Sequence, residues 1–270
     1  DEKFQLDLPS IVNNLEVKFD GQGEETLVML HGWPDSLELW DKQVEFLKQN
    51  YRIARFTLPG FELEDNGKRP HYNVQQIRSI IDSFIRSLNQ ETVTVLAHDW
   101  GAIYAFQYLK KNDLVDRLIL FDIGSFGDEK PPTANIKYTF AFAVAWILPE
   151  FLGEKLIAYT AKNIVKIEDV DPNKTFADLR VDPSMTYPYW HKWNSVLSKN
   201  SVKAIAVENY GTPFLFIYGE DKKIWFHSKS WEEKIQTLNK GQVESVPGGH
   251  WFMQSSPDIV NRKISKWLYN

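Results

Sequence analysis

The strongest constraint on the fold of this 270-residue chain is the alternation of short β-branched runs with segments of helical period. Apolar side chains from Val74 to Leu88 recur every three or four residues, which is typical of an amphipathic helix. Strands that alternate with helices form parallel sheets with helices on both faces. The sequence therefore predicts an α/β fold. Five segments before the middle of the chain have the length and composition of strands: residues 15–19, 26–30, 51–57, 91–97 and 117–121.

The alternation stops at Gly124 and resumes only after Gly211, with a further strand expected at 214–218. The intervening residues are rich in Pro and aromatic side chains and contain a helical pattern from 136 to 148. A long interruption of a regular sheet is most simply an inserted lid. We therefore expect three parts: a first core part at 1–124, a helical cap at 125–211 and a second core part at 212–270.

The composition excludes several kinds of site. With 31 Lys and Arg against 36 Asp and Glu, the net charge of −5 gives no reason to expect nucleic acid as a partner. The chain has no Cys, which rules out disulfides, thiolate nucleophiles and thiolate metal sites. Its six His lack the spacing of metal ligands, and no Gly-rich phosphate loop follows the first strand. Neither a metal nor a cofactor is expected.

Membrane attachment is not expected either. The longest apolar run, residues 140–148, has nine residues, whereas a spanning helix needs roughly 20. The first residues, Asp1-Glu2-Lys3, do not show the basic and then apolar pattern of a targeting signal. We expect a soluble, cytoplasmic protein. Its 10 Trp, 11 Tyr and 17 Phe suit either an enzyme that binds an apolar small molecule or a tightly packed core.

The strongest local signal for chemistry is the sequence Val93 to Ala102, in which a strand enters a helix through a sharp turn at Asp99. A residue exposed on such a turn needs small neighbours two positions away, and Ala97 and Gly101 meet this requirement. A carboxylate at this position can attack saturated carbon and form an ester that water then hydrolyses. The alternative is that Asp99 only caps the helix that follows it.

Two further loops extend this pattern. His31-Gly32-Trp33-Pro34 follows a buried strand, so the backbone N–H groups of Trp33 and of Trp100 are candidates for an oxyanion hole. Near the end of the chain, His250 lies on a Gly-rich loop after the last strand. Such a loop can bring an imidazole to the carboxyl edge of the sheet, where open α/β sheets bind ligands. His250 is therefore the candidate base that activates water.

Together these three motifs resemble the α/β-hydrolase superfamily, and within it the branch of epoxide hydrolases and haloalkane dehalogenases, which use an aspartate nucleophile. The resemblance covers the chain outside the expected cap. It implies a mostly parallel eight-stranded sheet with helices on both faces and a helical cap inserted after the sixth strand. It also implies that Asp99 is the nucleophile, His250 the base, and Trp33 and Trp100 the oxyanion hole.

The acid that orients the histidine departs from the family pattern. Relatives usually place it three residues after the Gly that closes the seventh strand, and here that position holds Lys222. Lysine has no acceptor for an imidazole N–H. Two replacements are available: Asp221, one residue earlier, and Asp122, at the end of the preceding strand. We favour Asp122, because some dehalogenases carry their acid there.

In the epoxide hydrolases of the family, cap tyrosines protonate the epoxide oxygen. This chain offers five tyrosines in the region, and Tyr189 is our candidate for the catalytic acid. We expect Tyr187, together with His31 and Trp251 from the motifs, to bind the substrate. The five candidates are Tyr138, Tyr159, Tyr187, Tyr189 and Tyr210.

The preferred function is therefore hydrolysis of an epoxide to a diol through an ester on Asp99, which His250 helps water to cleave. Two alternatives stay open. A haloalkane dehalogenase uses the same nucleophile, and Trp100 fits both reactions. A non-catalytic binding protein with a hydrolase fold is the other alternative, which Lys222 at the usual acid position favours.

Overall fold

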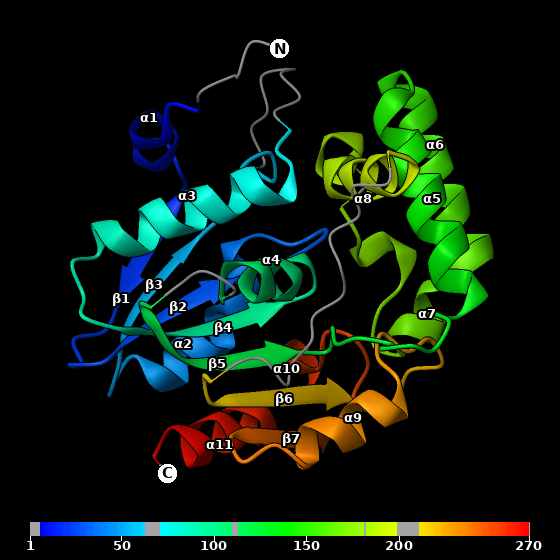
Figure 1. Ribbon diagram of the computed structural model, residues 1–270. Helices are drawn as coiled ribbons and strands as arrows, with labels where there is room; N and C mark the ends of the chain where they lie inside the picture. Colours follow the sequence, from blue (N-terminus) through cyan, green and yellow to red (C-terminus); the bar gives the residue numbers. More distant parts are fainter. Residues whose placement is uncertain (1–5, 63–70, 110–112, 181, 199–210, 270) are drawn as a thin grey trace.

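The computed structural model describes residues 6–62, 71–109, 113–180, 182–198 and 211–269. Seven strands form one sheet in the order β1-β3-β2-β4-β5-β6-β7 (Figure 1). β1 pairs antiparallel with β3, and all other neighbours are parallel, which confirms the predicted α/β fold. The strands are β1 (Val17–Asp20), β2 (Thr26–Leu30), β3 (Arg52–Phe56), β4 (Val93–His98), β5 (Val115–Phe121), β6 (Phe214–Gly219) and β7 (Gly241–Val246).

The described part of the chain supplies seven strands, whereas the family resemblance implied eight. Residues Leu8–Asn13, which precede β1, form the short helix α1. Its apolar side chains Leu8, Ile11 and Val12 have helical spacing and pack against the core. Because this segment is a helix, it adds no edge strand before β1.

The central strands are buried on both faces, as expected for a parallel sheet. Every residue of β2 is buried, and its side chains alternate between two separate apolar clusters. Val28 and Leu30 join the cluster beneath α3 and α4, while Leu27 and Met29 join the cluster beneath α2 and α11. Helices on both faces thus remove the central strands from water, whereas the edge strands β1 and β7 stay partly exposed.

Helix α3 (Val74–Ser87) shows how the sequence specifies these covering helices. Asn73 and Gln76 form a capping box, in which each side chain accepts a hydrogen bond from the backbone N–H of the other residue. The five apolar side chains on one face of α3 are buried, each of which stabilises the fold by about 1.5–3 kcal/mol. They are Ile77, Ile80, Ile81, Phe84 and Ile85.

The remaining core helices complete the two layers (Figure 1). α4 (Trp100–Leu109) and α9 (Lys229–Gln236) contribute buried side chains to the same cluster as α3. α2 (Asp41–Leu47), α10 (Phe252–Ser255) and α11 (Pro257–Leu268) contribute to the other cluster.

A set of helices, here called the inserted helices, occupies residues 133–197 between β5 and β6 (Figure 1). The predicted limits of the cap, 125 and 211, enclose them, although 199–210 lie outside the described residues. The elements are α5 (Thr133–Ile147), α6 (Glu150–Tyr159), a π-helical segment at 160–165, α7 (Ile167–Val170), 3-10 turns at 176–178 and 183–186, and α8 (Tyr187–Leu197).

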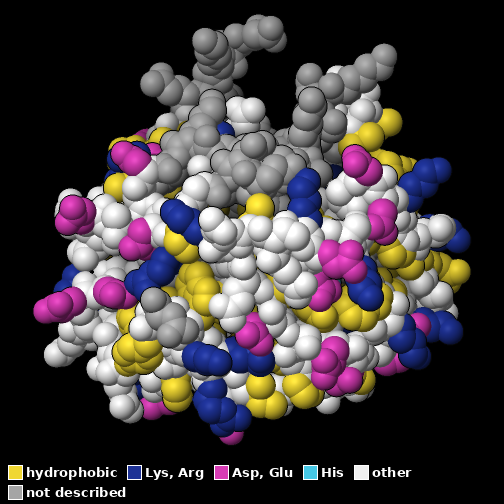
Figure 2. Space-filling view, turned by 60° about the horizontal axis from the view of Figure 1, so that its bottom comes forward, with side chains coloured by type: hydrophobic (Ala, Val, Ile, Leu, Met, Phe, Trp, Pro, Cys, Tyr) yellow, Lys and Arg dark blue, Asp and Glu magenta, His cyan; other side chains and the backbone are white. Residues whose placement is uncertain are grey.

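Hydrogen bonds fasten the inserted helices to the core. The amide of Asn135 donates to the Trp225 carbonyl, and the guanidinium of Arg180 donates to the Phe61 carbonyl. On the face shown in Figure 2, acidic and basic side chains are interspersed rather than gathered by sign. None of the helices in the described residues combines the length and the apolar character that crossing a membrane requires.

Candidate active site

Asp99 lies on the turn between β4 and α4, where the sequence predicted a strained nucleophile position. Its φ of 53° is in the left-handed region, which non-glycine residues rarely adopt. The turn also packs against the loop after β2, because a Cβ on Gly32 would lie 2.4 Å from the Cβ of Asp99. A Cβ on Gly101 would lie 2.5 Å from the His31 carbonyl oxygen. Small residues are therefore required on both sides of this contact.

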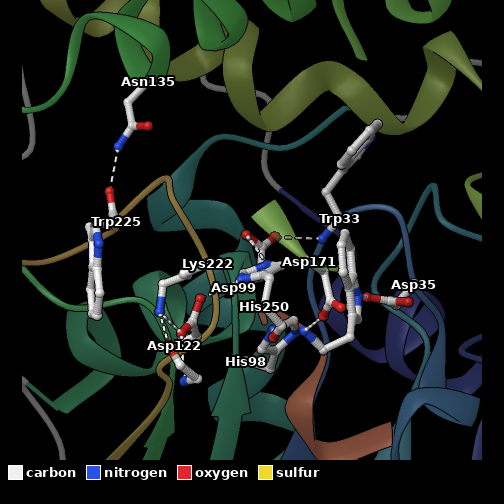
Figure 3. A network of polar contacts seen from close by, with 12 residues as sticks. Trp33, Asp35, His98, Asp99, Asp122, Asn135, Asp171, Lys222, Trp225 and His250 are labelled. Atoms are coloured by element: carbon white, nitrogen blue, oxygen red, sulfur yellow. Dashed lines mark hydrogen bonds and ion pairs between the residues drawn. The ribbon is translucent and has the colours of Figure 1, made fainter. Parts of the chain in front are cut away.

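The carboxylate of Asp99 is held by groups from two other loops (Figure 3). The backbone N–H of Trp33 donates to Oδ1 over 2.7 Å, and that of Trp100 also hydrogen-bonds the carboxylate. Oδ2 lies 3.5 Å from Nε2 of His250. A residue that only capped α4 would not make the contacts to Trp33 and His250. Burial is the largest single effect and favours the neutral acid, but the hydrogen bond and the charge of His250, together with the Trp100 N–H, lower the pKa of Asp99 below its usual value.

His250 joins two carboxylates across the carboxyl edge of the sheet (Figure 3). Its Nδ1 lies 2.7 Å from Oδ2 of Asp122, and Nε2 faces Asp99. Burial alone would lower the pKa of His250, but the hydrogen bonds to Asp122 and Asp99 and the charges of these two carboxylates together raise this pKa to about 9. In the resting state the imidazole is therefore an imidazolium between two carboxylates. Figure 3 also shows His98, whose Nε2–H donates to the His250 carbonyl over 2.9 Å.

The structure brings Asp122, and not Asp221, to His250. Asp122 follows β5 with a φ of 66°, and its side chain is fully buried. Burial opposes ionisation, but the charge of Lys222 and the hydrogen bond from His250 keep the pKa of Asp122 well below its usual value. The carboxylate of exposed Asp221 instead accepts a hydrogen bond from the Gly248 N–H over 2.6 Å. Asp221 thus braces the loop that carries the histidine.

A cavity of about 50 Å³ lies between this edge of the sheet and the inserted helices. Asp99 and His250 line it from the core, and Trp33 and Trp251 lie beside them. Most of the remaining wall is apolar, which favours a substrate with a hydrocarbon part. The apolar side chains include Phe142, Ala161, Val165, Ile167, Leu179 and Phe226.

Two tyrosines of the inserted helices line the same cavity: Tyr189 from α8 and Tyr138 from α5. Their ring centroids are 6.2 Å apart. The indole N–H of Trp100 donates to the Tyr189 hydroxyl. Burial raises the pKa of both tyrosines well above the usual value, so both hydroxyls are protonated at neutral pH. Sequence reasoning included Tyr138 among five candidates, and its helical spacing from Phe142 is the signal that both face one cavity.

Two residues that we expected to contact the substrate, His31 and Tyr187, are not among those that line the cavity. His31 is fully buried behind the cavity, where Nε2 accepts from the Leu58 N–H over 2.8 Å and Nδ1–H donates to the Gly32 carbonyl over 2.9 Å. Burial lowers the pKa of His31 to about 4, so its imidazole is neutral and links two loops by these hydrogen bonds. Tyr187 is also fully buried, and its hydroxyl donates to the Pro59 carbonyl over 2.9 Å. Both side chains form loop and core contacts instead of lining the cavity.

Two carboxylates near the site, those of buried Asp171 and half-buried Asp35, escaped the sequence analysis. Asp171, after α7, accepts from the Trp251 N–H over 2.7 Å, and Asp35 accepts from the Trp251 indole over 2.8 Å (Figure 3). Burial raises the pKa of Asp35 to about 6. The two residues hold Trp251 from opposite sides and so fix the loop of the adjacent His250. The position of Asp35, directly after His31-Gly32-Trp33-Pro34, was the available sequence signal.

Comparison with known proteins agrees with this architecture. The family model described as alpha/beta hydrolase fold matches residues 25–257. Epoxide hydrolase 1 of Caenorhabditis elegans is 23% identical over 308 aligned positions, which cover 99% of this chain and 74% of the relative.

Among solved structures, an esterase from Thermogutta terrifontis superposes with a TM-score of 0.72 at 18% identity and covers 94% of this chain and 93% of its own. An epoxide hydrolase from Vigna radiata superposes with a TM-score of 0.62 at 16% identity, with coverages of 94% and 93%. At these identities the solved structures show a shared fold.

Proposed function

Because the chain belongs to the α/β-hydrolase fold family, we propose that it hydrolyses a small epoxide to a diol through an ester on Asp99. The observation that carries this proposal is the set of polar groups that line one cavity. A carboxylate held by backbone N–H groups faces two protonated tyrosine hydroxyls across an apolar space. Epoxide opening needs these two functions together, since a nucleophile must attack carbon while an acid protonates the leaving oxygen.

In the first step, Oδ2 of Asp99 attacks one epoxide carbon, and the C–O bond on that carbon breaks. Tyr138 or Tyr189 protonates the oxygen that leaves. Oδ1, which already accepts the hydrogen bond from the Trp33 N–H, becomes the carbonyl oxygen of the ester. The oxyanion hole is thus assembled before the ester forms.

Ester formation prepares the second step. Asp99 loses its negative charge, so one of the two carboxylates that raise the pKa of His250 becomes neutral. The imidazolium of His250 then passes its proton to the tyrosinate left by the first step. Neutral His250, held by Asp122, takes a proton from water, which attacks the ester carbonyl while the N–H groups of Trp33 and Trp100 stabilise the oxyanion. Collapse breaks the bond between Cγ and the oxygen of the product. The water protons end on the diol, by way of His250 and the tyrosine, and Asp99 returns to a carboxylate.

The inserted helices act in this proposal as a cap that closes over the substrate, with domain limits at 125 and 211. The mostly apolar wall of the cavity favours an epoxide with a hydrocarbon substituent. The argument for a non-catalytic protein, which rested on Lys222, loses its support because Asp122 contacts His250 instead.

The test is a single turnover in ¹⁸O-labelled water with excess enzyme and 1,2-epoxybutane. Our mechanism transfers an unlabelled Asp99 oxygen to the diol and leaves one ¹⁸O in Asp99, which peptide mass spectrometry detects. Label found only in the diol would overturn the covalent route. Halide release from 1-bromobutane without diol formation from epoxides would favour the dehalogenase alternative, and no turnover of either substrate would favour a binding protein.

A further inference from the structure

Lys222 is a fully buried cation behind the proposed catalytic residues (Figure 3). Its Nζ lies 2.7 Å from Oδ1 of Asp122 and 2.6 Å from the carbonyl oxygen of Gly219. The ammonium also lies 4.5 Å from the ring centroid of Trp225 and 5.4 Å from that of Tyr218. Lysine side chains are almost never fully buried without a partner. The partner here is the same carboxylate that binds His250.

The sheet topology brings these groups together. β5 and β6 are neighbours, so Asp122 at the end of β5 lies beside the loop that begins at Gly219. The backbone N–H of Gly219 donates to Oδ1 of Asp122 over 3.2 Å, alongside the ammonium of Lys222. Two donors therefore occupy Oδ1 and leave Oδ2 for His250. Lys222 thus fixes the rotation of the carboxylate that orients the imidazole.

The charges of the three groups explain why a lysine is useful here. With His250 neutral, Lys222 and ionised Asp122 sum to zero. Without the ammonium, the same protonation state would leave one buried, uncompensated negative charge, which a low-dielectric interior penalises strongly. The pair of Asp122 and His250 would then retain a proton to a higher pH, and an imidazolium cannot take a proton from water.

We propose that Lys222 is a positioning residue, which balances the charge of Asp122 and so keeps His250 neutral during hydrolysis of the ester. This inference rests on the proposed function of His250 as the base. It gives a physical reason for a lysine where relatives carry the orienting acid: the acid moved to β5, and a cation took its former place.

The other titratable groups around the pair come from several elements. His98 on β4 packs against His250 with ring centroids 4.3 Å apart, and burial lowers its pKa to about 3, so it is neutral. Burial likewise lowers the pKa of His227, which is near Lys222, to about 4. Around His250 and its neighbour Trp251, the charged groups are Asp99, Asp35, Asp171 and Lys174. Besides His250, the basic side chain that contacts Asp122 within the described residues is Lys222.

The experiment follows the His250 ring by NMR in ¹⁵N-histidine-labelled protein that carries Asp99→Asn. This background makes residue 99 neutral, as in the ester, and separates the titration of His250 from its contact with Asp99. Lys222→Gln keeps a donor for Oδ1 and removes the charge. We expect it to raise the midpoint of the His250 titration by about one to two pH units. Lys222→Arg should restore the lower midpoint.

The matched control is Lys223→Gln. Lys223 is adjacent but exposed, and it pairs with Asp169 over 2.7 Å, so its loss should leave the midpoint unchanged. A midpoint that Lys222→Gln leaves unchanged or lowers, or an equal shift in Lys223→Gln, would overturn the inference. With Asp99 intact, the acid limb of kcat for diol formation should move upward in Lys222→Gln. If the wild type hydrolyses no epoxide, the proposed function fails, whereas the ring titration still tests Lys222.

A second variant covers the case in which Lys222→Gln does not fold. Lys222→Met combined with Asp122→Asn removes both charges of the buried pair together, which is far less destabilising than removing one. If the double variant folds and Lys222→Gln does not, the result supports charge compensation by Lys222. Failure of both variants to fold would mean that Lys222 acts through packing, and the inference would be wrong.

Discussion

Replacement of Asp122 by Asn should slow hydrolysis of the ester much more than its formation. The hydrolysis step creates an imidazolium whose Nδ1 lies 2.7 Å from the Asp122 carboxylate. At an effective dielectric constant near 20, opposite charges about 4 Å apart attract by about 4 kcal/mol, or about a thousandfold in rate. An amide can also stabilise the wrong tautomer, and loss of an orienting carboxylate lowers kcat by about 10⁴ in serine proteases. We expect kcat for diol formation to fall by about 10³ to 10⁴.

The assay combines diol formation with intact-protein mass spectrometry after rapid quenching. Because attack by Asp99 does not need His250 as a base, Asp122→Asn should accumulate the ester as a mass increase equal to one substrate. The variant also leaves the ammonium of Lys222 without its anionic partner, so a loss of about 3–5 kcal/mol in unfolding free energy is expected, and the assay must be run on folded protein.

Asp221→Asn is the matched control, since this exposed carboxylate contacts the same loop through the Gly248 N–H. It should keep kcat within a few-fold of the wild type. The reasoning is refuted if Asp122→Asn retains turnover, or if Asp221→Asn is the variant that accumulates the ester.

Three other predictions follow from the structure. Tyr138→Phe and Tyr189→Phe should each slow ester formation by about 10² to 10⁴ in stopped-flow measurements. Tyr187→Phe, outside the cavity, should not slow it. Equal effects in all three variants would contradict the assignment of Tyr138 and Tyr189 as proton donors. Ile81→Ala, in the buried face of α3, should lower the unfolding free energy by about 2–5 kcal/mol in urea, and a smaller loss would mean that this face is less tightly packed. The pKa of His250 is raised from 6.5 to about 9. The stability that this group contributes is therefore fully present below pH 6.5 and is lost as the pH rises to about 9. His250→Gln should abolish that part of the pH dependence of the unfolding free energy, measured by urea titration.

The sequence was sufficient for the secondary structure of the core because its signals are local. A buried parallel strand needs apolar side chains on both faces, and residues 26–30 show this in both the sequence and β2. The helical period from Val74 likewise specifies α3 and the face that it buries. The family resemblance was less informative, because it implied eight strands, whereas the described residues form seven and residues 8–13 form a helix.

In the candidate site, too, some features follow from consecutive residues and others depend on the tertiary structure. The turn at Asp99, the loop after β2 and the loop of His250 are each recognisable from a few consecutive residues, so their positions followed from the sequence. The choice of Asp122 as the acid that orients His250 rested on the family resemblance alone. By position in the sequence, Asp122 and Asp221 are about equally well placed until the pairing of β5 with β6 fixes the neighbouring atoms. The partner of Lys222 was undetermined for the same reason.

Tertiary packing also decided which aromatic side chains face the cavity. Tyr187 and Tyr189 are two residues apart on α8, yet the first hydrogen-bonds the Pro59 carbonyl and the second lines the cavity with Asp99. Their different roles follow from the orientation of α8 relative to the sheet, which depends on contacts between residues more than 100 positions apart. The sequence determined which groups are available for chemistry, and the packing of distant segments determined which of them meet.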